Sequence, residues 1–175
     1  MADGRAGSDS PLRWYALYTR PRHEKKVAYQ LTYKGIDHFL PLWRVRRRWS
    51  DRWKEVAFPL FPNYLFVRLN LEDVRQYITV LRTPGVVGLV RFNGRVEPVP
   101  AEEVESVRRI CESPLPYDPF PYLQEGRWVE IVRGPLKGLR GWIVEREGTC
   151  QVVVSVHILQ RSVAVKVSSM DLQPL

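Results

Sequence analysis

The sequence has few of the residues from which metalloproteins and disulfide-linked proteins are built. Among its 175 residues there are two cysteines and three histidines. Cys111 and Cys150 lie far apart, without the paired spacing of a metal cage or a disulfide, and they suit a reducing cytoplasm. His23, His38 and His157 are equally scattered, so we expect each to be a structural or surface residue. The sequence therefore predicts no metal site.

The common motifs of catalysis are missing as well. There is no nucleophile elbow, no phosphate-binding Walker loop and no glycine-rich dinucleotide turn. The three glycines of "GPLKGLRG", residues 134–141, have a different spacing and are expected in a turn between strands. We therefore expect no catalytic residue, no cofactor and no enzymatic activity.

Long apolar runs are also absent. No uninterrupted hydrophobic stretch approaches the roughly 20 residues that a membrane-spanning helix needs, and the first ten residues, "MADGRAGSDS", contain no apolar run. The sequence predicts a cytoplasmic protein without membrane contact, with a disordered tail over residues 1–11.

Positive charge is present in excess and is unevenly distributed. The formal net charge is +8, with an isoelectric point of about 9.8. Residues 1–112 carry 20 Lys and Arg against 13 Asp and Glu, whereas residues 113–175 carry 7 against 6. A polyanionic partner is therefore expected to meet the first part of the chain.

Proline marks the boundary between those two parts. Four prolines in "ESPLPYDPFPY" remove backbone donors and fix φ, which excludes a helix or a central strand there. We expect a semi-extended linker over residues 113–123, with one domain before it, 12–112, and one after it, 124–175.

The first domain mixes strands and helices in an order that predicts an α+β fold, an antiparallel sheet with helices packed against it. Helices are predicted from Pro21 to Gly35, with Val27, Ala28 and Leu31 buried, over 71–81, with Leu71, Val74 and Ile78 as its apolar stripe, and after Pro100. Asn93-Gly94 predicts a tight hairpin turn.

The second domain contains no helical pattern. Short strands at regular spacing, "RWVEIVRG", "RGWIVERE", "CQVVVSVHIL" and "SVAVKVS", predict a small β-barrel. Val152–Val156 and Val163–Val167 are rich in β-branched residues, which favours a permanent barrel that does not switch to helices.

The stretch "WRVRRRWSDRWK", residues 43–54, places three tryptophans among six cations and one acid. Odd positions hold Trp43, Val45, Trp49 and Trp53, and even positions hold Arg44, Arg46, Arg48, Arg52 and Lys54. This period of two, with Ser50-Asp51 as a turn, predicts a hairpin with one packed aromatic face and one cationic face. Either the cations are merely solvated, or they bind a polyanion.

Two sets of motifs resemble known families. "VEIVRGPLKGLRGWIVE" resembles the KOW motif, which ribosomal proteins and transcription factors share. Before it, "WYALYTRPRHEKKVA", "FPLFPNYLFVRL", "LRTPGVVGLVRF" and "PVPAEEVESV" resemble the N-terminal (NGN) domain of NusG-type factors. Together they cover residues 13–175, and their detail is most similar to the specialised UpxY, LoaP and RfaH type of antiterminator. The remaining alternative is a KOW-containing RNA-binding ribosomal or ribosome-assembly protein.

The resemblance implies a fold, a function and a first set of site residues. It implies a ferredoxin-like sandwich followed by an SH3-like barrel, in a monomeric factor that regulates transcription elongation and termination. The first domain would bind the clamp helices of the RNA polymerase β′ subunit and bridge to the β subunit. The implied contact residues are Tyr15, Phe61, Pro62, Asn63 and Tyr64. Asn63 replaces the family's glycine and is expected to adopt a positive φ.

The resemblance also implies contacts with DNA and with a partner of the barrel. Residues expected at the β subunit, the non-template strand or the upstream DNA are Arg20, Arg22, His23, Arg44, Arg46, Arg48 and Arg52. The tryptophans of the hairpin are expected mainly as scaffold, with a stacking role for Trp49, nearest the turn, as the weaker alternative. For Arg20, Arg22 and His23 a solvated helix start is an equal alternative.

The barrel's implied partners are a ribosomal protein, the termination factor Rho or RNA. The residues expected to contact them are Arg133, Leu136, Lys137, Leu159 and Arg161. Leu159 stands where the housekeeping factor has phenylalanine, which argues against coupling to the ribosome or to Rho.

Overall fold

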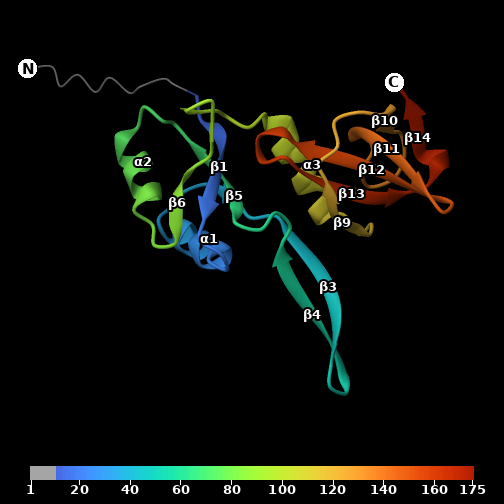
Figure 1. Cartoon of the computed structure of the whole chain (residues 1–175), viewed down its shortest axis with the longest axis horizontal. Coiled ribbons are helices and arrows are strands. Elements are labelled where there is room, and N and C mark those ends of the chain that lie inside the picture. Colours follow the sequence, from blue (N-terminus) through green and yellow to red (C-terminus); the bar gives the residue numbers. More distant parts are fainter. Residues whose placement is uncertain (1–10) are drawn as a thin grey trace, which may run out of the picture.

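A four-stranded antiparallel sheet forms the centre of the N-terminal part, with strands in the order β2-β5-β1-β6 (Figure 1). The computed structural model describes residues 11–175, so the predicted disordered tail, 1–11, lies outside the described residues except for Pro11. The elements of this part are β1 (Arg13–Thr19), α1 (Glu24–Tyr33), β2 (His38–Phe39), β5 (Tyr64–Leu69), α2 (Val74–Leu81), β6 (Val86–Leu89) and α3 (Ala101–Glu112). The predicted α+β fold is confirmed.

The two faces of this sheet are covered by different helices. Because side chains alternate along a strand, Leu17 of β1 packs with Val27 and Leu31 of α1 on one face. Ala16, its neighbour, packs with Val104 of α3 on the other face. The predicted buried positions Val27 and Leu31 are confirmed, whereas Ala28 is only half-buried.

Helix α2 buries a different stripe from the predicted one. The Asp73 side chain caps the helix by accepting hydrogen bonds from the N–H groups of Arg75 and Gln76, so the helix begins after Leu71. Val80 is buried, while Val74 and Ile78 are exposed. The prediction was wrong because the segment carries two apolar stripes, and spacing alone does not decide which of them faces the sheet.

Two hairpins extend from this part. β3 (Leu42–Trp49) and β4 (Arg52–Pro59) form a separate two-stranded ribbon that projects away from the sheet (Figure 1). β7 (Arg91–Phe92) and β8 (Arg95–Val96) are joined by Asn93 and Gly94, whose φ angles are 50° and 75°. Positive φ at both positions is the signature of a type I′ turn, so the predicted tight turn is confirmed.

The C-terminal part is a strongly curled antiparallel sheet of six strands, in the order β14-β10-β11-β12-β13-β9. Its elements are β9 (Tyr117–Pro121), β10 (Trp128–Ile131), β11 (Arg140–Arg146), β12 (Thr149–Val156), η1 (His157–Leu159), β13 (Arg161–Val167), η2 (Ser169–Asp171) and β14 (Leu172–Pro174). Valines of β12 and β13 fill its interior: Val152, Val154, Val163 and Val165. The predicted small barrel is confirmed.

Part of the proline-rich segment belongs to this barrel. β9 pairs with β13 from Tyr117↔Val165 to Pro121↔Arg161. It is an edge strand, where prolines are tolerated because one side of the strand needs no backbone donor. The Tyr117 hydroxyl donates a hydrogen bond of 2.6 Å to the carbonyl oxygen of Leu42, in the first residue of the projecting hairpin.

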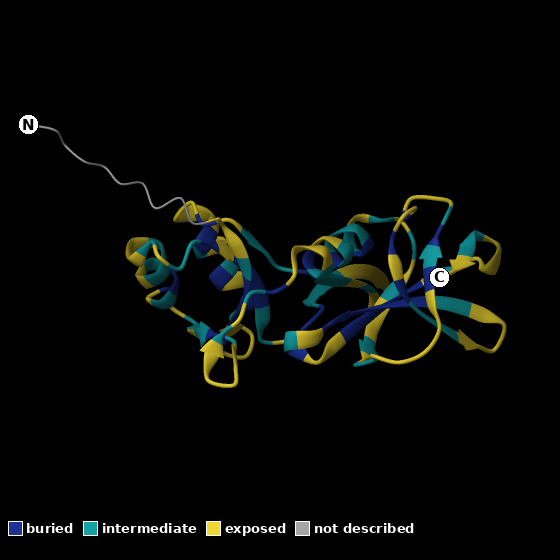
Figure 2. Cartoon of the chain, turned by 90° about the horizontal axis from the view of Figure 1, so that it is seen from above, coloured by how far each residue is buried: buried dark blue, intermediate teal, exposed yellow. Residues whose placement is uncertain are grey.

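The two parts contact each other through α3. Buried residues of the sheet, of α3 and of the barrel form one continuous apolar cluster. The Arg109 guanidinium donates a hydrogen bond of 2.8 Å to the carbonyl oxygen of Lys137 in the barrel. Figure 2 shows the buried residues in the interiors of both parts and the exposed ones on the loops and helix surfaces. α3 therefore packs against the sheet on one side and lies beside the barrel on the other.

Candidate functional site

The segment Phe61–Tyr64 forms a tight turn before β5. The Tyr64 N–H donates to the Phe61 carbonyl oxygen at 3.1 Å, and Asn63 has a φ of 72°. Proline at the second position and a positive φ at the third define a type II turn. The expected positive φ of Asn63 is thus confirmed. Phe61 is only 1% exposed and anchors the turn in the core rather than lying at the surface.

A buried carboxylate holds this turn in place. Glu24, the first residue of α1, is 5% exposed, and its Oε1 accepts a hydrogen bond of 2.9 Å from the Asn63 N–H. The Asn63 carbonyl oxygen in turn accepts a bond of 2.8 Å from the Thr19 N–H. The turn is therefore tied to both α1 and β1. Sequence reasoning missed Glu24, because an acid in the first turn of a helix is common for reasons of the helix dipole alone.

Tyr18, which is exposed, and Tyr64, which is half-buried against the core, form an aromatic surface next to the turn, which we call the tyrosine surface. They are directly opposite each other on β1 and β5, with ring centroids 5.4 Å apart, and Tyr18 is 37% exposed. On the other side of Tyr18 lies Gly88, and no atom lies within 4 Å of where a Cβ on Gly88 would be. The sheet is therefore left bare beside the two rings.

Tyr15, the tyrosine predicted for this surface, lies elsewhere. It is buried on the opposite face of the sheet, under α1 and α2, and that burial raises the pKa of its hydroxyl. An odd separation along a strand reverses the direction of a side chain, so Tyr15 and Tyr18 cannot share a face. The prediction that Tyr15 reaches the surface was wrong. Tyr15 lies two positions before the core residue Leu17 and so shares its face, whereas Tyr18 points to the other face; this alternation was the missed signal.

The predicted cations at the start of α1 divide into two kinds. Arg20 and Arg22 are exposed. His23 is half-buried, and its Nδ1 lies 2.9 Å from the Pro21 carbonyl oxygen. A Cβ on Gly85 would come within 3.1 Å of the His23 Cβ, so this glycine permits the close approach of the loop before β6 to α1. His23 therefore has a structural role in this packing.

The projecting hairpin has cations and tryptophans on both of its faces. Residues opposite each other point to the same side, and the pairs run from Trp43↔Phe58 to Arg48↔Trp53 and Trp49↔Arg52. One face carries Trp43, Val45, Arg47, Trp49, Arg52, Lys54, Val56 and Phe58; the other carries Arg44, Arg46, Arg48, Trp53, Glu55 and Ala57.

The prediction of one aromatic and one cationic face was therefore wrong. The turn has two residues, Ser50 and Asp51, so even positions of β4 lie opposite odd positions of β3. Trp43 is half-buried and packs at the base of the hairpin, 6.5 Å from Phe58. Trp49 and Trp53 are 70% and 68% exposed, so the expected scaffold role holds for Trp43 but not for these two.

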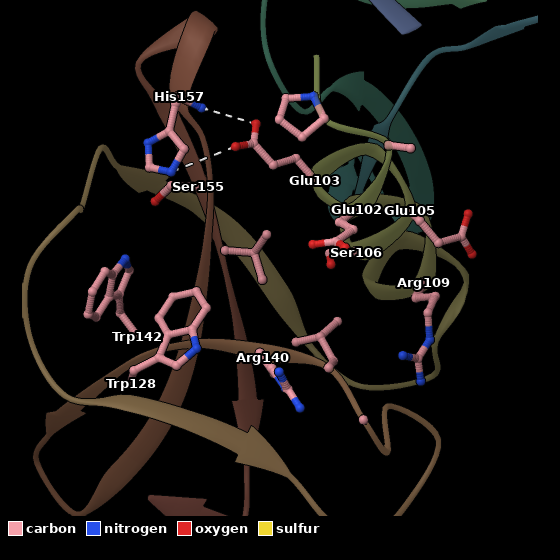
Figure 3. Close-up of a pocket in the computed structure, with 15 residues that line it drawn as sticks. Glu102, Glu103, Glu105, Ser106, Arg109, Trp128, Arg140, Trp142, Ser155 and His157 are labelled. Carbon is pink, nitrogen blue, oxygen red and sulfur yellow. Dashed lines mark hydrogen bonds and ion pairs between the residues drawn. The ribbon is translucent and has the colours of Figure 1, made fainter. Parts of the chain in front are cut away.

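A cleft of about 810 Å³ lies between α3 and the barrel (Figure 3). On the helix side, Glu103 accepts a hydrogen bond of 3.3 Å from the His157 N–H, and its other oxygen lies 3.7 Å from His157 Nε2. Burial raises the pKa of Glu103, and the nearby His157 lowers it by a smaller amount. On the barrel side, Trp128 and Trp142 pack edge to face with centroids 4.6 Å apart. The cleft thus combines a carboxylate–histidine contact and an aromatic pair.

The residues predicted to bind a partner of the barrel also divide by exposure. Arg133, Lys137 and Arg161 are exposed, whereas Leu136 and Leu159 are buried in the core. The two leucines are therefore packing residues, because their side chains are not available to a partner. That Arg133, Lys137 and Arg161 contact a partner of the barrel stays a prediction.

The described residues hold no group of three or more His, Cys, Asp or Glu side chains that could bind a metal ion. Across residues 11–175, no helix is both long enough and apolar enough to span a membrane.

The chain is similar to known transcription factors over most of its length. A family model described as "Transcription termination factor nusG" matches residues 12–108. The "Transcription termination/antitermination protein NusG" of Streptococcus pyogenes is 30% identical over 145 residues, which are 77% of this chain and 80% of that protein. The protein of the same name from Thermus thermophilus is 27% identical and covers 83% of this chain and 90% of its own length.

Among solved structures, one described as "Domain interaction in Thermotoga maritima NusG" has a similar fold, with a TM-score of 0.55 at 24% identity, covering 94% of this chain and 97% of that one. The family model covers more than half of this chain and includes β1, the Phe61–Tyr64 turn and the hairpin. The chain therefore belongs to the NusG family of transcription termination/antitermination factors.

Proposed function

We propose that this protein binds RNA polymerase through the tyrosine surface and suppresses pausing or termination, acting by binding rather than by catalysis. The observation that carries the proposal is the pair Tyr18 and Tyr64 on a bare stretch of sheet. Exposed tyrosines are typical of protein interfaces, since they offer a large apolar ring with a polar tip at little entropic cost. The expected occupant is the pair of clamp helices of the β′ subunit.

The architecture around the two rings supports a preformed interface. Phe61 anchors the adjacent turn in the core, and Glu24 of α1 accepts a hydrogen bond from it. The turn is therefore already ordered, so binding a partner there costs little conformational entropy. Pro62 is exposed and Asn63 half-buried at the tip of that turn, directly before Tyr64 in the chain. A helical pair that lies on the bare sheet would therefore meet both the rings and the turn.

The cations lie before α1 and along the hairpin, and they suit DNA or the β subunit. Lys25 of α1 donates a hydrogen bond to the carbonyl oxygen of Ala57 in β4, so the start of the helix lies against the base of the hairpin. Arg20 and Arg22 precede this helix, and the arginines of the hairpin extend from its base. We propose that these side chains contact phosphates of the non-template or upstream DNA, which positions the protein without reading sequence.

Two finer assignments are part of the proposal. The alternative of a ribosomal protein would rest on the barrel alone, whereas the match to the family model lies in residues 12–108, before the barrel. We further propose a specialised member of the UpxY, LoaP and RfaH type, on the basis of the motifs in its sequence. For the barrel, a protein or RNA partner is proposed at Arg133, Lys137 and Arg161.

Transcription reconstituted from purified bacterial RNA polymerase tests the function. Addition of the full chain is expected to shorten pauses and increase read-through of a terminator. Retention of the polymerase on the immobilised chain after nuclease treatment is expected in parallel. Absence of any measurable affinity for the polymerase at low ionic strength would refute the proposal.

A further inference from the structure

The hairpin tip carries two large apolar side chains that the fold does not use. Trp49 and Trp53 are 70% and 68% exposed, far more than the half-buried Trp43 at the base. Neither indole belongs to a ring pair or a cation-π pair within residues 11–175. Exposing two such rings has no benefit for folding, so their position needs another reason.

Both indoles border one hollow. They line an open space of about 590 Å³ together with Arg52 and Lys54. The register points the two rings to opposite sides of the ribbon. Both rings nevertheless border the same open space, because they lie in adjacent residue pairs at the end of the narrow ribbon and can be reached around its edge. A flat, ring-shaped ligand could therefore contact either indole or both.

The surrounding charges are almost all positive and are unpaired. In the part of the chain that the structure describes, the side chains of Arg46, Arg48, Arg52 and Lys54 make no hydrogen bond and no ion pair. Arg47 differs, because it lies 4.8 Å from the centre of the Phe58 ring, toward the base. Each indole thus has free cations beside it on its own face.

We propose that the hairpin tip binds unpaired nucleobases of a single-stranded nucleic acid, with Trp49 and Trp53 stacking on bases while the flanking arginines and Lys54 contact phosphates. The inference rests on the proposed contact of the hairpin with nucleic acid and names its ligand. Alternation of rings and cations matches the alternation of bases and phosphates along a strand. Bases within a duplex are already stacked on each other, so a duplex offers phosphates to the cations but no free base faces to the indoles.

The same residues fit a membrane surface less well. Interfacial membrane binding needs one continuous apolar face opposite a charged one. Here each face of the ribbon carries both a tryptophan and cations, so no purely apolar face exists for insertion.

Binding of the full chain to labelled oligo-dT of about 12 nucleotides, within the site sizes of single-strand binders, tests the inference without polymerase. Fluorescence anisotropy is measured at several salt concentrations. Trp49→Leu and Trp53→Leu are each expected to weaken binding by about 5- to 150-fold, with an unchanged dependence of log Kd on log salt. Arg46→Gln is expected to reduce that slope by about 0.7, the value for one lost phosphate contact on a single strand.

Matched controls separate stacking from other causes. Trp49→Phe keeps an aromatic ring and should retain most of the affinity, while Tyr33→Leu, an exposed aromatic of α1, should have no effect. On a duplex of the same length, the leucine variants should bind like the parent. Oligo-U in place of oligo-dT decides whether the strand is RNA or DNA.

Three results would overturn the inference: no binding of the parent to oligo-dT at low salt, equal binding of the parent and the leucine variants, or an equal loss on the duplex. Loss of binding to anionic vesicles in the leucine variants, with oligo-dT binding intact, would instead indicate a membrane contact. Because no polymerase is present, a failed polymerase interaction leaves these outcomes unchanged. Conversely, a negative result with oligo-dT would not contradict the proposed binding of RNA polymerase to the tyrosine surface.

Discussion

The tyrosine surface and the hairpin tip both expose aromatic rings, but they differ in what surrounds those rings. Tyr18 and Tyr64 lie on the central sheet, beside the bare backbone at Gly88 and a turn that is anchored in the core. Trp49 and Trp53 lie at the end of a two-stranded ribbon, among four unpaired cations. The comparison teaches that exposed rings alone do not indicate a partner. A surface anchored in the core suits a protein, whereas rings that alternate with cations suit a nucleic acid.

The two surfaces also differ in how they are supported. The tyrosine surface belongs to a sheet that is covered by helices on both faces. An isolated two-stranded hairpin is only marginally stable, and this one depends on contacts at its base. These are Trp43 against Phe58, Lys25 to the Ala57 carbonyl oxygen, and the Tyr117 hydroxyl to the Leu42 carbonyl oxygen. The tip is thus far from the core, while the base is fixed to it.

The largest expected effect separates the two surfaces directly. The double substitution Tyr18→Ala with Tyr64→Ala should weaken binding to RNA polymerase by about 100-fold, as expected for the loss of aromatic hot spots. Binding to oligo-dT should stay unchanged, because neither ring lies on the hairpin. Polymerase affinity is measured by biolayer interferometry and compared with that of Tyr29→Ala, an exposed tyrosine of α1. If the double variant binds polymerase like the parent, the interface is misplaced.

Phe61 is unsuitable for this test, although sequence reasoning assigned it to the same interface. Its side chain is almost completely buried, so Phe61→Ala should destabilise the fold by about 3 to 5 kcal/mol. A loss of polymerase binding in that variant would not distinguish a lost contact from a lost fold.

A second effect tests whether the turn beside the tyrosines is preformed. Glu24→Ala leaves the Asn63 N–H without its partner, and a hydrogen bond to a charged group contributes about 1.5 to 3 kcal/mol. We expect lower stability in urea denaturation and weaker polymerase binding, with oligo-dT binding preserved. Glu24→Gln is the matched control, since its amide oxygen can still accept the bond. Equal behaviour of the alanine and glutamine variants would show that the carboxylate does not organise the turn.

A third effect tests how much the arginines of the hairpin contribute to nucleic-acid binding. Arg46→Glu with Arg48→Glu should weaken oligo-dT binding by at least roughly tenfold and reduce its salt dependence. Binding to an isolated clamp-helix fragment should change little. Activity in pause and read-through assays should therefore fall more than affinity for that fragment. Arg75→Glu with Arg82→Glu, two charge reversals at α2 and its C-cap, controls for net charge, and an equal effect of this variant would mean that the hairpin has no special role.

Features that depend on a few neighbouring residues could be predicted from the sequence. The Asn93-Gly94 turn follows from local sterics, and the positive φ of Asn63 follows from the glycine that the resembling family has at that position. The prolines correctly excluded a central strand, but the segment was expected to be a linker, and its pairing with β13 as an edge strand was not predicted. The fold class followed from the order of strand and helix patterns. In each case the information lies within a few positions along the chain.

Features that depend on contacts between distant segments could not be predicted. The faces of the hairpin depend on how β3 pairs with β4 across the turn. A turn longer or shorter by one residue would have put Trp49 and Trp53 on the same face. The choice between Tyr15 and Tyr18 depends on which side of β1 the helices cover. The hydrogen bond between Glu24 and Asn63 joins segments 39 residues apart, and neither segment contains a motif that predicts it.

The smallest expected effect concerns the tie between the hairpin and the barrel. Tyr117→Phe removes the hydrogen bond to the Leu42 carbonyl oxygen and should lower the free energy of unfolding by about 1 kcal/mol at neutral pH. The pKa of Tyr117 is raised from 10.0 to about 12, mainly by burial and in smaller part by its neighbour Cys111. The folded state therefore favours the protonated phenol. Its stabilising contribution is complete below pH 10 and is lost as the pH rises through 12.

The stability difference between the parent and Tyr117→Phe should accordingly be largest below pH 10 and shrink toward pH 12. Urea denaturation across this range measures it, with Tyr33→Phe, at an exposed position of α1, as the control that should follow the parent. Burial also raises the pKa of Cys111, to about 11, and the hydrogen bond with Tyr117 opposes that rise. The thiol would therefore titrate differently in the two proteins, so both curves are measured in a Cys111→Ala background. Parallel curves would mean that the hydroxyl does not hold the base of the hairpin to the barrel, and the ribbon would then depend on Trp43 and Lys25 for its support.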